Sequence, residues 1–149
     1  MTTWIRAWAF LAPFFMAVGL LSATTYTINV SANTSGVISY VHSHGGKKGH
    51  QFVKLHDTIV WQCDPMPDTG YSCSAVGVKF KSSAPCTVSM NTCYVTDNSD
   101  LAPFPYSIAV SYNSGLAVDD PDVIVDNAGV LDLDGKQGAA PKKAVPKKK

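Results

Sequence analysis

Apolar and polar side chains alternate with a period of two residues in the segment Val53-Lys54-Leu55-His56-Asp57-Thr58-Ile59-Val60-Trp61. The apolar positions are Val53, Leu55, Ile59 and Trp61. Such alternation directs one set of side chains into a core and the other into solvent, which is typical of β-strands with one buried face. His56 and Asp57 interrupt the pattern, so the segment is predicted to form two short strands joined by a bend.

Similar patterns recur along the chain between turn-forming residues. Turn signals separate them every 8 to 15 residues, and no helical period extends over a useful length. The composition agrees, because all eleven acidic residues are Asp and Arg6 is the only arginine, whereas Val, Ser and Thr are frequent. We therefore predict an all-β fold, a Greek-key β-sandwich of seven to nine short strands. The predicted strands include 26–30, 37–42, 51–55, 58–63, 76–80, 106–112 and 122–126.

Residues 1–23 have the pattern of a secretory signal peptide. Arg6 supplies a positive charge, residues 7–21 are almost continuously apolar, and Ser22-Ala23 offers a small-residue cleavage site. The apolar stretch is short for a membrane span. We therefore expect a secreted or periplasmic protein with no transmembrane segment after signal cleavage, the alternative being an uncleaved anchor.

Four cysteines, Cys63, Cys73, Cys86 and Cys93, lie in the middle of the chain. In an exported protein an even number of cysteines indicates disulfides. Of the three pairings that are open, we favour Cys63–Cys73 and Cys86–Cys93, because both close short local loops. A zinc site is the alternative, although the closely paired cysteines that are typical of zinc sites are absent.

Charge is segregated at the C-terminal end of the chain. A run rich in Asp is followed by a run rich in Lys, and residues 130–149 have too little to bury to fold, so they are predicted to form a disordered tail behind a domain of residues 24–129. The tail is expected to attract an anionic surface or cell-envelope component, without sequence-specific recognition of nucleic acid. The lysines concerned are Lys142, Lys143, Lys147, Lys148 and Lys149. The alternative is a tail that only aids solubility.

Three segments resemble the cupredoxin family. Residues 53–61 are similar to a strand–turn–strand unit of that family, which has a Gly-Asp turn followed by Thr-Val-x-Trp, with His56 here in place of the glycine. Residues 104–110 resemble the penultimate strand, and residues 120–126 resemble the last strand of secreted, copper-free members. The resemblance spans residues 26–127 and implies a cupredoxin-like β-sandwich.

The resemblance does not extend to a blue-copper centre. Such a centre needs two His, one Cys thiolate and usually an axial Met, and in the family most of these ligands lie in the loop after the penultimate strand. No Cys, His or Met follows Cys93 in this chain, and residues 76–80, where the other His is expected, contain none. We therefore expect the fold without type 1 copper electron transfer.

Four histidines lie within fifteen residues of one another. His42 and His44 share a face if their strand continues, and the Gly-Gly-Lys-Lys-Gly turn would bring His50 back toward them. Neutral imidazoles that converge in this way would hold Cu(II), Ni(II) or Zn(II). The candidate metal ligands are therefore His42, His44 and His50, with His56 as a further one. The alternative is a solvated hairpin whose histidines bind nothing.

Catalytic motifs are mostly absent. Residues 70–74 resemble a nucleophile elbow around Ser72, except at the last position, which should be Gly. All histidines precede Ser72, and no two Asp are marked as a catalytic pair. We therefore predict a non-catalytic secreted binding or structural module with no catalytic residues and no cofactor. The alternative is a metal-binding protein that uses the histidine cluster.

Overall fold

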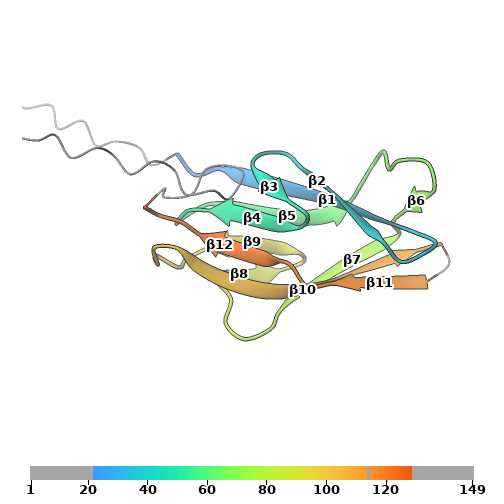
Figure 1. Ribbon diagram of the computed structural model, residues 1–149. Coiled ribbons are helices and arrows are strands. Elements are labelled where there is room, and N and C mark those ends of the chain that lie inside the picture. The colour runs from blue at the N-terminus through green and yellow to red at the C-terminus, as the bar shows by residue number, and fades with distance from the viewer. Residues whose placement is uncertain (1–21, 114, 129–149) are drawn as a thin grey trace, which may run out of the picture.

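A computed structural model describes residues 22–113 and 115–128 of the chain (Figure 1). These residues form twelve β-strands and no helix. The strands are β1 (Thr25–Asn33), β2 (Ile38–His42), β3 (Gly46–Lys47), β4 (His50–Val53), β5 (Thr58–Cys63), β6 (Tyr71–Ser72), β7 (Ala75–Phe80), β8 (Cys86–Ser89), β9 (Thr92–Val95), β10 (Ala102–Tyr112), β11 (Gly115–Asp119) and β12 (Asp122–Val125). They make two sheets that face each other, so the prediction of an all-β sandwich is confirmed.

The first sheet has the strand order β2-β1-β5-β9-β8, and β6 pairs with the end of β1. β1 pairs antiparallel with β2 and parallel with β5. The alternating pattern of β1 turns Ile28 and Val30 into the core, where both are fully buried. The same period in β5 buries Ile59 and Trp61, so these two strands carry the apolar face of the first sheet.

The second sheet is built around β10 and has the order β11-β10-β12-β4-β3, with β7 along the other edge of β10. β11 and β12 pair with successive parts of β10 in a single antiparallel register. Between them, the N–H of Tyr106 donates to the carbonyl of Pro121 over 2.9 Å. Because Pro121 has no N–H of its own for the ladder, the returning strand divides there into β11 and β12. β12 then pairs in parallel with β4.

The core lies between the two sheets, and aromatic rings fill its centre. Trp61 of β5 and Tyr106 of β10 are almost fully buried, and their ring centroids lie 5.2 Å apart. Phe80 of β7 completes the cluster at 5.7 Å from Tyr106. Burying side chains of this size stabilises a fold by roughly 1.5–3 kcal/mol each. The aromatic cluster therefore joins the two sheets at the point where their inward faces meet.

Residues 54–57 form a turn between β4 and β5, as predicted. Asp57 is buried, and its carboxylate accepts hydrogen bonds from the N–H groups of Thr24 (2.9 Å) and Lys54 (2.7 Å). The N–H of Leu55 donates to Asn127 Oδ1 over 2.7 Å. His56 has a φ of 73°, a conformation that favours glycine. This turn therefore contacts both the beginning and the end of the described domain.

The structure contains more strands than the seven to nine that the pattern indicated. β3 and β6 are only two residues long, and β11 follows the predicted strand 106–112, at the position where the cupredoxin family has a ligand-bearing loop. A two-residue strand has no measurable period, and β11 is recognised only through its register with β10. Both disulfides, Cys63–Cys73 and Cys86–Cys93, are confirmed.

Two predictions concern segments that the structure leaves largely or wholly undescribed. Of the predicted signal peptide, residues 1–21 lie outside the described residues, and so does the predicted Lys-rich tail with all five of its candidate surface-binding lysines. In the part of the chain that is described, no helix has the length and apolarity that a membrane crossing requires.

Candidate functional site

His42, the first predicted metal ligand, uses both of its ring nitrogens in hydrogen bonds within the protein. Its Nδ1 lies 3.0 Å from Oε1 of the fully buried Gln51, and its Nε2 accepts the N–H of Gly49 over 3.3 Å. These contacts define a neutral ring with its proton on Nδ1. Burial lowers the pKa of His42; the Gln51 hydrogen bond opposes this, and the nearby His50 adds to it. His42 thus holds the β3–β4 hairpin to β2.

The other histidines have separate partners. His44 Nδ1 lies 3.3 Å from Ser43 Oγ, and His56 Nδ1 lies 3.0 Å from the hydroxyl of Tyr94, in the first sheet. His50 contacts Asp122 of β12. Among residues 22–113 and 115–128, no three His, Cys, Asp or Glu side chains form a group that could hold a metal ion. The structure therefore brings His50 near His42 without gathering all four, and metal binding stays a prediction.

The β3–β4 hairpin has a tight turn whose shape its sequence explains. Lys48 and Gly49 connect the strands with φ values of 51° and 82°, and positive φ at both central residues is what two-residue hairpin turns of type I′ need. The carbonyl of Gly49 accepts a hydrogen bond of 2.5 Å from the buried hydroxyl of Tyr106. That hydroxyl in turn accepts the Nε1–H of Trp61 over 3.1 Å. The hairpin is therefore anchored to the aromatic core.

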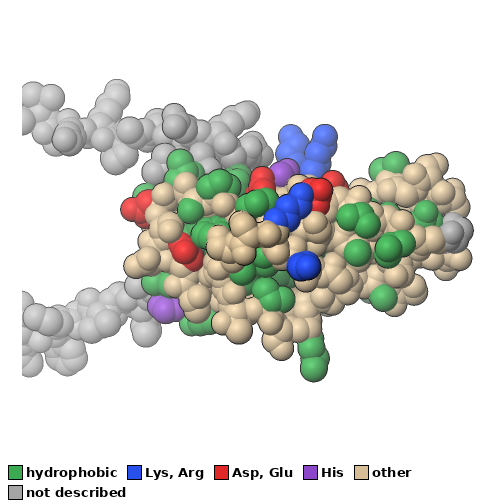
Figure 2. Space-filling view, turned by 90° about the horizontal axis from the view of Figure 1, so that it is seen from below, with side chains coloured by type: hydrophobic (Ala, Val, Ile, Leu, Met, Phe, Trp, Pro, Cys, Tyr) green, Lys and Arg blue, Asp and Glu red, His purple; other side chains and the backbone are tan. Residues whose placement is uncertain are grey.

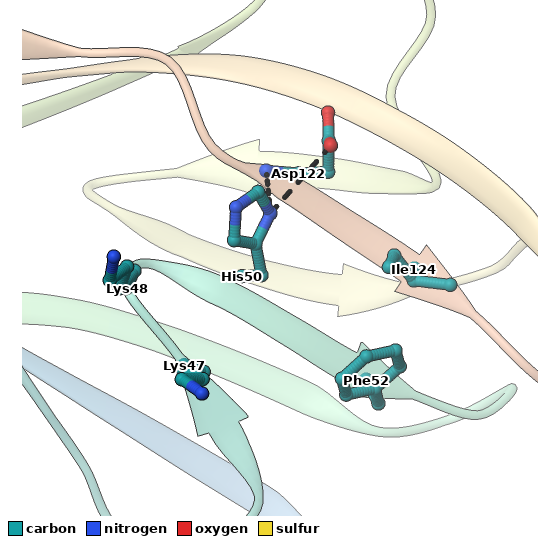
Figure 3. A pocket seen from close by; sticks show the side chains of 6 residues that line it. All are labelled: Lys47, Lys48, His50, Phe52, Asp122 and Ile124. Carbon is teal, nitrogen blue, oxygen red and sulfur yellow. Dashed lines mark hydrogen bonds and ion pairs between the residues drawn. The ribbon is translucent and has the colours of Figure 1, made fainter. Parts of the chain in front are cut away.

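A shallow pocket of about 320 Å³ lies beside this hairpin, on the outer face of β4 and β12 (Figure 3). We call it the β4–β12 pocket, and its lining is Lys47, Lys48, His50, Phe52, Asp122 and Ile124. Parallel pairing aligns Ile124 with Phe52, so these two apolar side chains stand next to each other on one face. Figure 2 shows lysine, histidine and aspartate side chains gathered along one edge of the molecule, and the pocket combines these residue types.

The polar groups of the β4–β12 pocket have a defined arrangement. His50 Nδ1 accepts the backbone N–H of Asp122 over 3.1 Å, and Asp122 Oδ2 lies 3.6 Å from the same nitrogen. A ring that accepts at Nδ1 carries its proton on Nε2, so the neutral His50 presents an N–H donor. Within the described residues, Lys47 and Lys48 form no ion pair. The pocket therefore offers free positive charge, one N–H donor and an apolar surface.

A second hollow of about 290 Å³ lies by the β4–β5 turn and is lined by Lys54, Leu55, His56, Asn98 and Asn127. Its polar groups mostly bind one another. Asn127 accepts from the Leu55 N–H and donates to the carbonyl of Ser99, and His56 contacts Tyr94. This hollow therefore serves the packing of the turn, whereas the β4–β12 pocket keeps unpaired groups.

Sequence reasoning missed the β4–β12 pocket. The sequence indicated His50 only as a metal ligand, the two lysines only as part of a turn, and Asp122 and Ile124 only as part of a strand. One signal was available. Phe52 and Ile124 are apolar, yet they occupy outward positions of their strands, where a strand with one buried face normally has polar residues. Their meeting depends on the parallel pairing of β4 with β12, which local patterns do not reveal.

Comparison with known proteins supplies no family for this chain. No protein-family model matches it, and no curated protein sequence is significantly similar to it. A function for the pocket is therefore argued from the chemistry of its own residues.

Proposed function

We propose that this protein is a non-catalytic, secreted binding module with a cupredoxin-like fold and no blue-copper centre, and that the β4–β12 pocket is its ligand site. The observation that carries the proposal is the joint presence of unpaired lysines and neighbouring apolar side chains around one hollow. Binding pockets for small ligands typically combine apolar walls with a few polar groups that set orientation.

The rigidity of the hairpin supports a binding role. Gly49 follows Lys47 and Lys48 and precedes β4. Its N–H donates to His42, and its carbonyl accepts from the hydroxyl of Tyr106. Gln51 adds hydrogen bonds to the carbonyls of Gly45 and Phe52. A site that is already ordered before binding loses less entropy when the ligand arrives. The pocket is thus built on a supported part of the fold.

Two observations support the secreted, cupredoxin-like part of the proposal. All four cysteines of the chain are in disulfides, which form and persist in oxidising compartments such as the periplasm and the cell exterior. The three segments that resemble cupredoxins are also neighbours in space, because β12 pairs with β10, Val125 of β12 pairs with Val53, and Trp61 packs against Tyr106. A shared scaffold would bring them together in this way.

A comparison of fragment binding by two tryptophan variants tests the ligand site. Ile124→Trp would fill the β4–β12 pocket, whereas Val118→Trp places the same side chain on β11, where Val118 is 60% exposed. A panel of several hundred small acids, bases and neutral fragments is screened against the purified protein by ligand-observed NMR. We expect the fragments that bind the wild type to be lost with Ile124→Trp and kept with Val118→Trp. Equal binding to both variants would refute the assignment of the pocket.

A further inference from the structure

Given that the β4–β12 pocket is the ligand site, as proposed above, we infer that its ligand is a small carboxylate with an apolar body. The carboxylate would lie among Lys47, Lys48 and the Nε2–H of His50, and the apolar body would lie against Phe52 and Ile124. This inference names the chemical class of the ligand, which the proposed function leaves open.

The hairpin side of the pocket supplies the positive charge. Lys47 ends β3 and Lys48 begins the turn, and Figure 3 shows both on the same side of the pocket. Within the described residues, the carboxylates of Asp122 and Asp120 lie near His50 and Lys81, and neither contacts Lys47 or Lys48. An anionic group that binds here therefore displaces no ion-pair partner of these lysines from the part of the chain that the structure describes. Lysine ammonium groups bind carboxylates through charge-assisted hydrogen bonds.

His50 supplies a directed donor next to that charge. Its Nδ1 is engaged by the backbone N–H of Asp122, and Nε2 lies on the opposite side of the ring from that bond (Figure 3). Side-chain exposure of 42% for His50 leaves room for a ligand to approach. The Nε2–H therefore fits an acceptor oxygen of the ligand, which a carboxylate provides and a cation does not.

The other half of the pocket is apolar. Phe52 lies two residues beyond His50 on the same face of β4, and Ile124 is its partner on β12. Two residues along a strand correspond to about 6.6 Å, so the acid and the centre of the apolar body are expected at about that separation. The volume of about 320 Å³ is near the lower end of the range for small-molecule sites. A short aryl or alkyl acid meets both conditions.

Charge balance favours a single negative charge. The lining holds two lysines and one aspartate, which leaves a net charge of +1 when His50 is neutral. The Asp122 carboxylate, which lies on the Nδ1 side of the His50 ring, also opposes a more highly charged anion. A monocarboxylate therefore complements the site better than a phosphate dianion does.

Titration with matched probes tests this class. Phenylbutyrate, its neutral amide phenylbutyramide, acetate and phenyl phosphate are each added to the purified protein while backbone amide shifts are followed. We expect phenylbutyrate to shift amides at residues 46–52 and 122–124 and to bind at least about tenfold more tightly than the amide or acetate, since a hydrogen bond to a charged group is worth about that factor. Lys47→Gln with Lys48→Gln should remove the preference for the acid, and Lys79→Gln on β7 is the matched lysine control.

Four results would overturn the inference. Equal affinity of the pocket for acid and amide, or tighter binding of phenyl phosphate, would show a pocket of another specificity, with the proposed function intact. Shifts from phenylbutyrate that map elsewhere, or a preference for the acid over the amide that persists in the double lysine variant, would also contradict it. The proposed function itself is tested separately, by the binding of the fragment panel to the Ile124→Trp and Val118→Trp variants.

Discussion

The buried hydroxyl of Tyr106 donates a hydrogen bond of 2.5 Å to the carbonyl oxygen of Gly49. This bond runs from the middle of β10 to the turn of the β3–β4 hairpin, residues that are 57 positions apart in the chain. It connects the centre of the core with the segment that carries the pocket lysines. The stability of the core and the shape of the candidate site are therefore coupled.

The variant Tyr106→Phe tests this coupling. It keeps the ring in the aromatic cluster but leaves Trp61 Nε1–H and the Gly49 carbonyl without their partner. Leaving buried polar groups unsatisfied costs about 1–3 kcal/mol each, so we expect the free energy of unfolding in urea to fall by about 2–6 kcal/mol. Tyr94→Phe, at a residue that is 47% exposed, is the control and should change little. A fall of the same size in both variants would contradict the account.

Gly49→Ala tests the close approach at the turn. A Cβ at this position would lie 2.8 Å from Tyr40 Cε1 and 2.9 Å from Pro121 Cβ and Cγ. The positive φ adds a cost of about 1–2 kcal/mol for any residue with a Cβ, and overpacking adds about 1–3 kcal/mol. Gly70→Ala isolates the first cost, because Gly70 has a φ of 88° and no atom within 4 Å of the added Cβ. Chemical unfolding should show Gly49→Ala as clearly the less stable of the two.

Stability is expected to depend on pH through His42. Since burial lowers the pKa of His42 in the folded protein below its ordinary value of 6.5, the unfolded chain binds the proton more readily. The contribution of the neutral ring is therefore fully present above about pH 6.5 and is lost as the pH falls through the lowered pKa. Urea midpoints measured from pH 8 to pH 5 should fall toward acid.

The non-titrating variant His42→Gln should be less stable at neutral pH and should show a flatter pH dependence. His44→Gln is the control for this experiment, because His44 is exposed and its ring hydrogen-bonds to the neighbouring Ser43. If the wild type and His42→Gln lose stability in parallel on acidification, another group is responsible.

His56→Gly should stabilise the protein. His56 is exposed and adopts a φ of 73°, which costs a residue with a Cβ about 1–2 kcal/mol, and glycine avoids this cost at an entropic loss of about 0.5–1 kcal/mol. The exposed contact with Tyr94 that is lost contributes little. We expect a gain of about 0.5–1 kcal/mol in thermal or urea unfolding. His44→Gly, at a position without positive φ, should instead be neutral or destabilising.

Asp57→Ala should be strongly destabilising. Removing the buried carboxylate leaves the N–H groups of Thr24 and Lys54 without acceptors, at a cost of about 1–3 kcal/mol each. Asp120→Asn removes one partner of the exposed ion pair with Lys81 and should have almost no effect on unfolding. A comparable loss from both substitutions would contradict the role assigned to Asp57.

The sequence predicted the parts of the fold that depend on local patterns. The alternation of residues 53–61 identified the buried faces of Val53, Ile59 and Trp61 and the turn between the strands, and the short loops identified both disulfides. Prediction failed where contacts span the chain. The partner of His42 is Gln51, and His50 meets Asp122 only because β4 and β12 run in parallel. Neither relationship leaves a local trace in the sequence, so the contact of His42 with Gln51 and the β4–β12 pocket were not predicted, and metal binding by the histidines stays a prediction.

The most direct test of the central claim is a map of backbone amide chemical-shift changes over the whole domain, recorded with the tightest-binding fragment from the panel. We predict saturable changes centred on residues 46–53 and 122–125, around the β4–β12 pocket. Changes centred on the hollow by Leu55 and Asn127, or the absence of any saturable change, would contradict the claim.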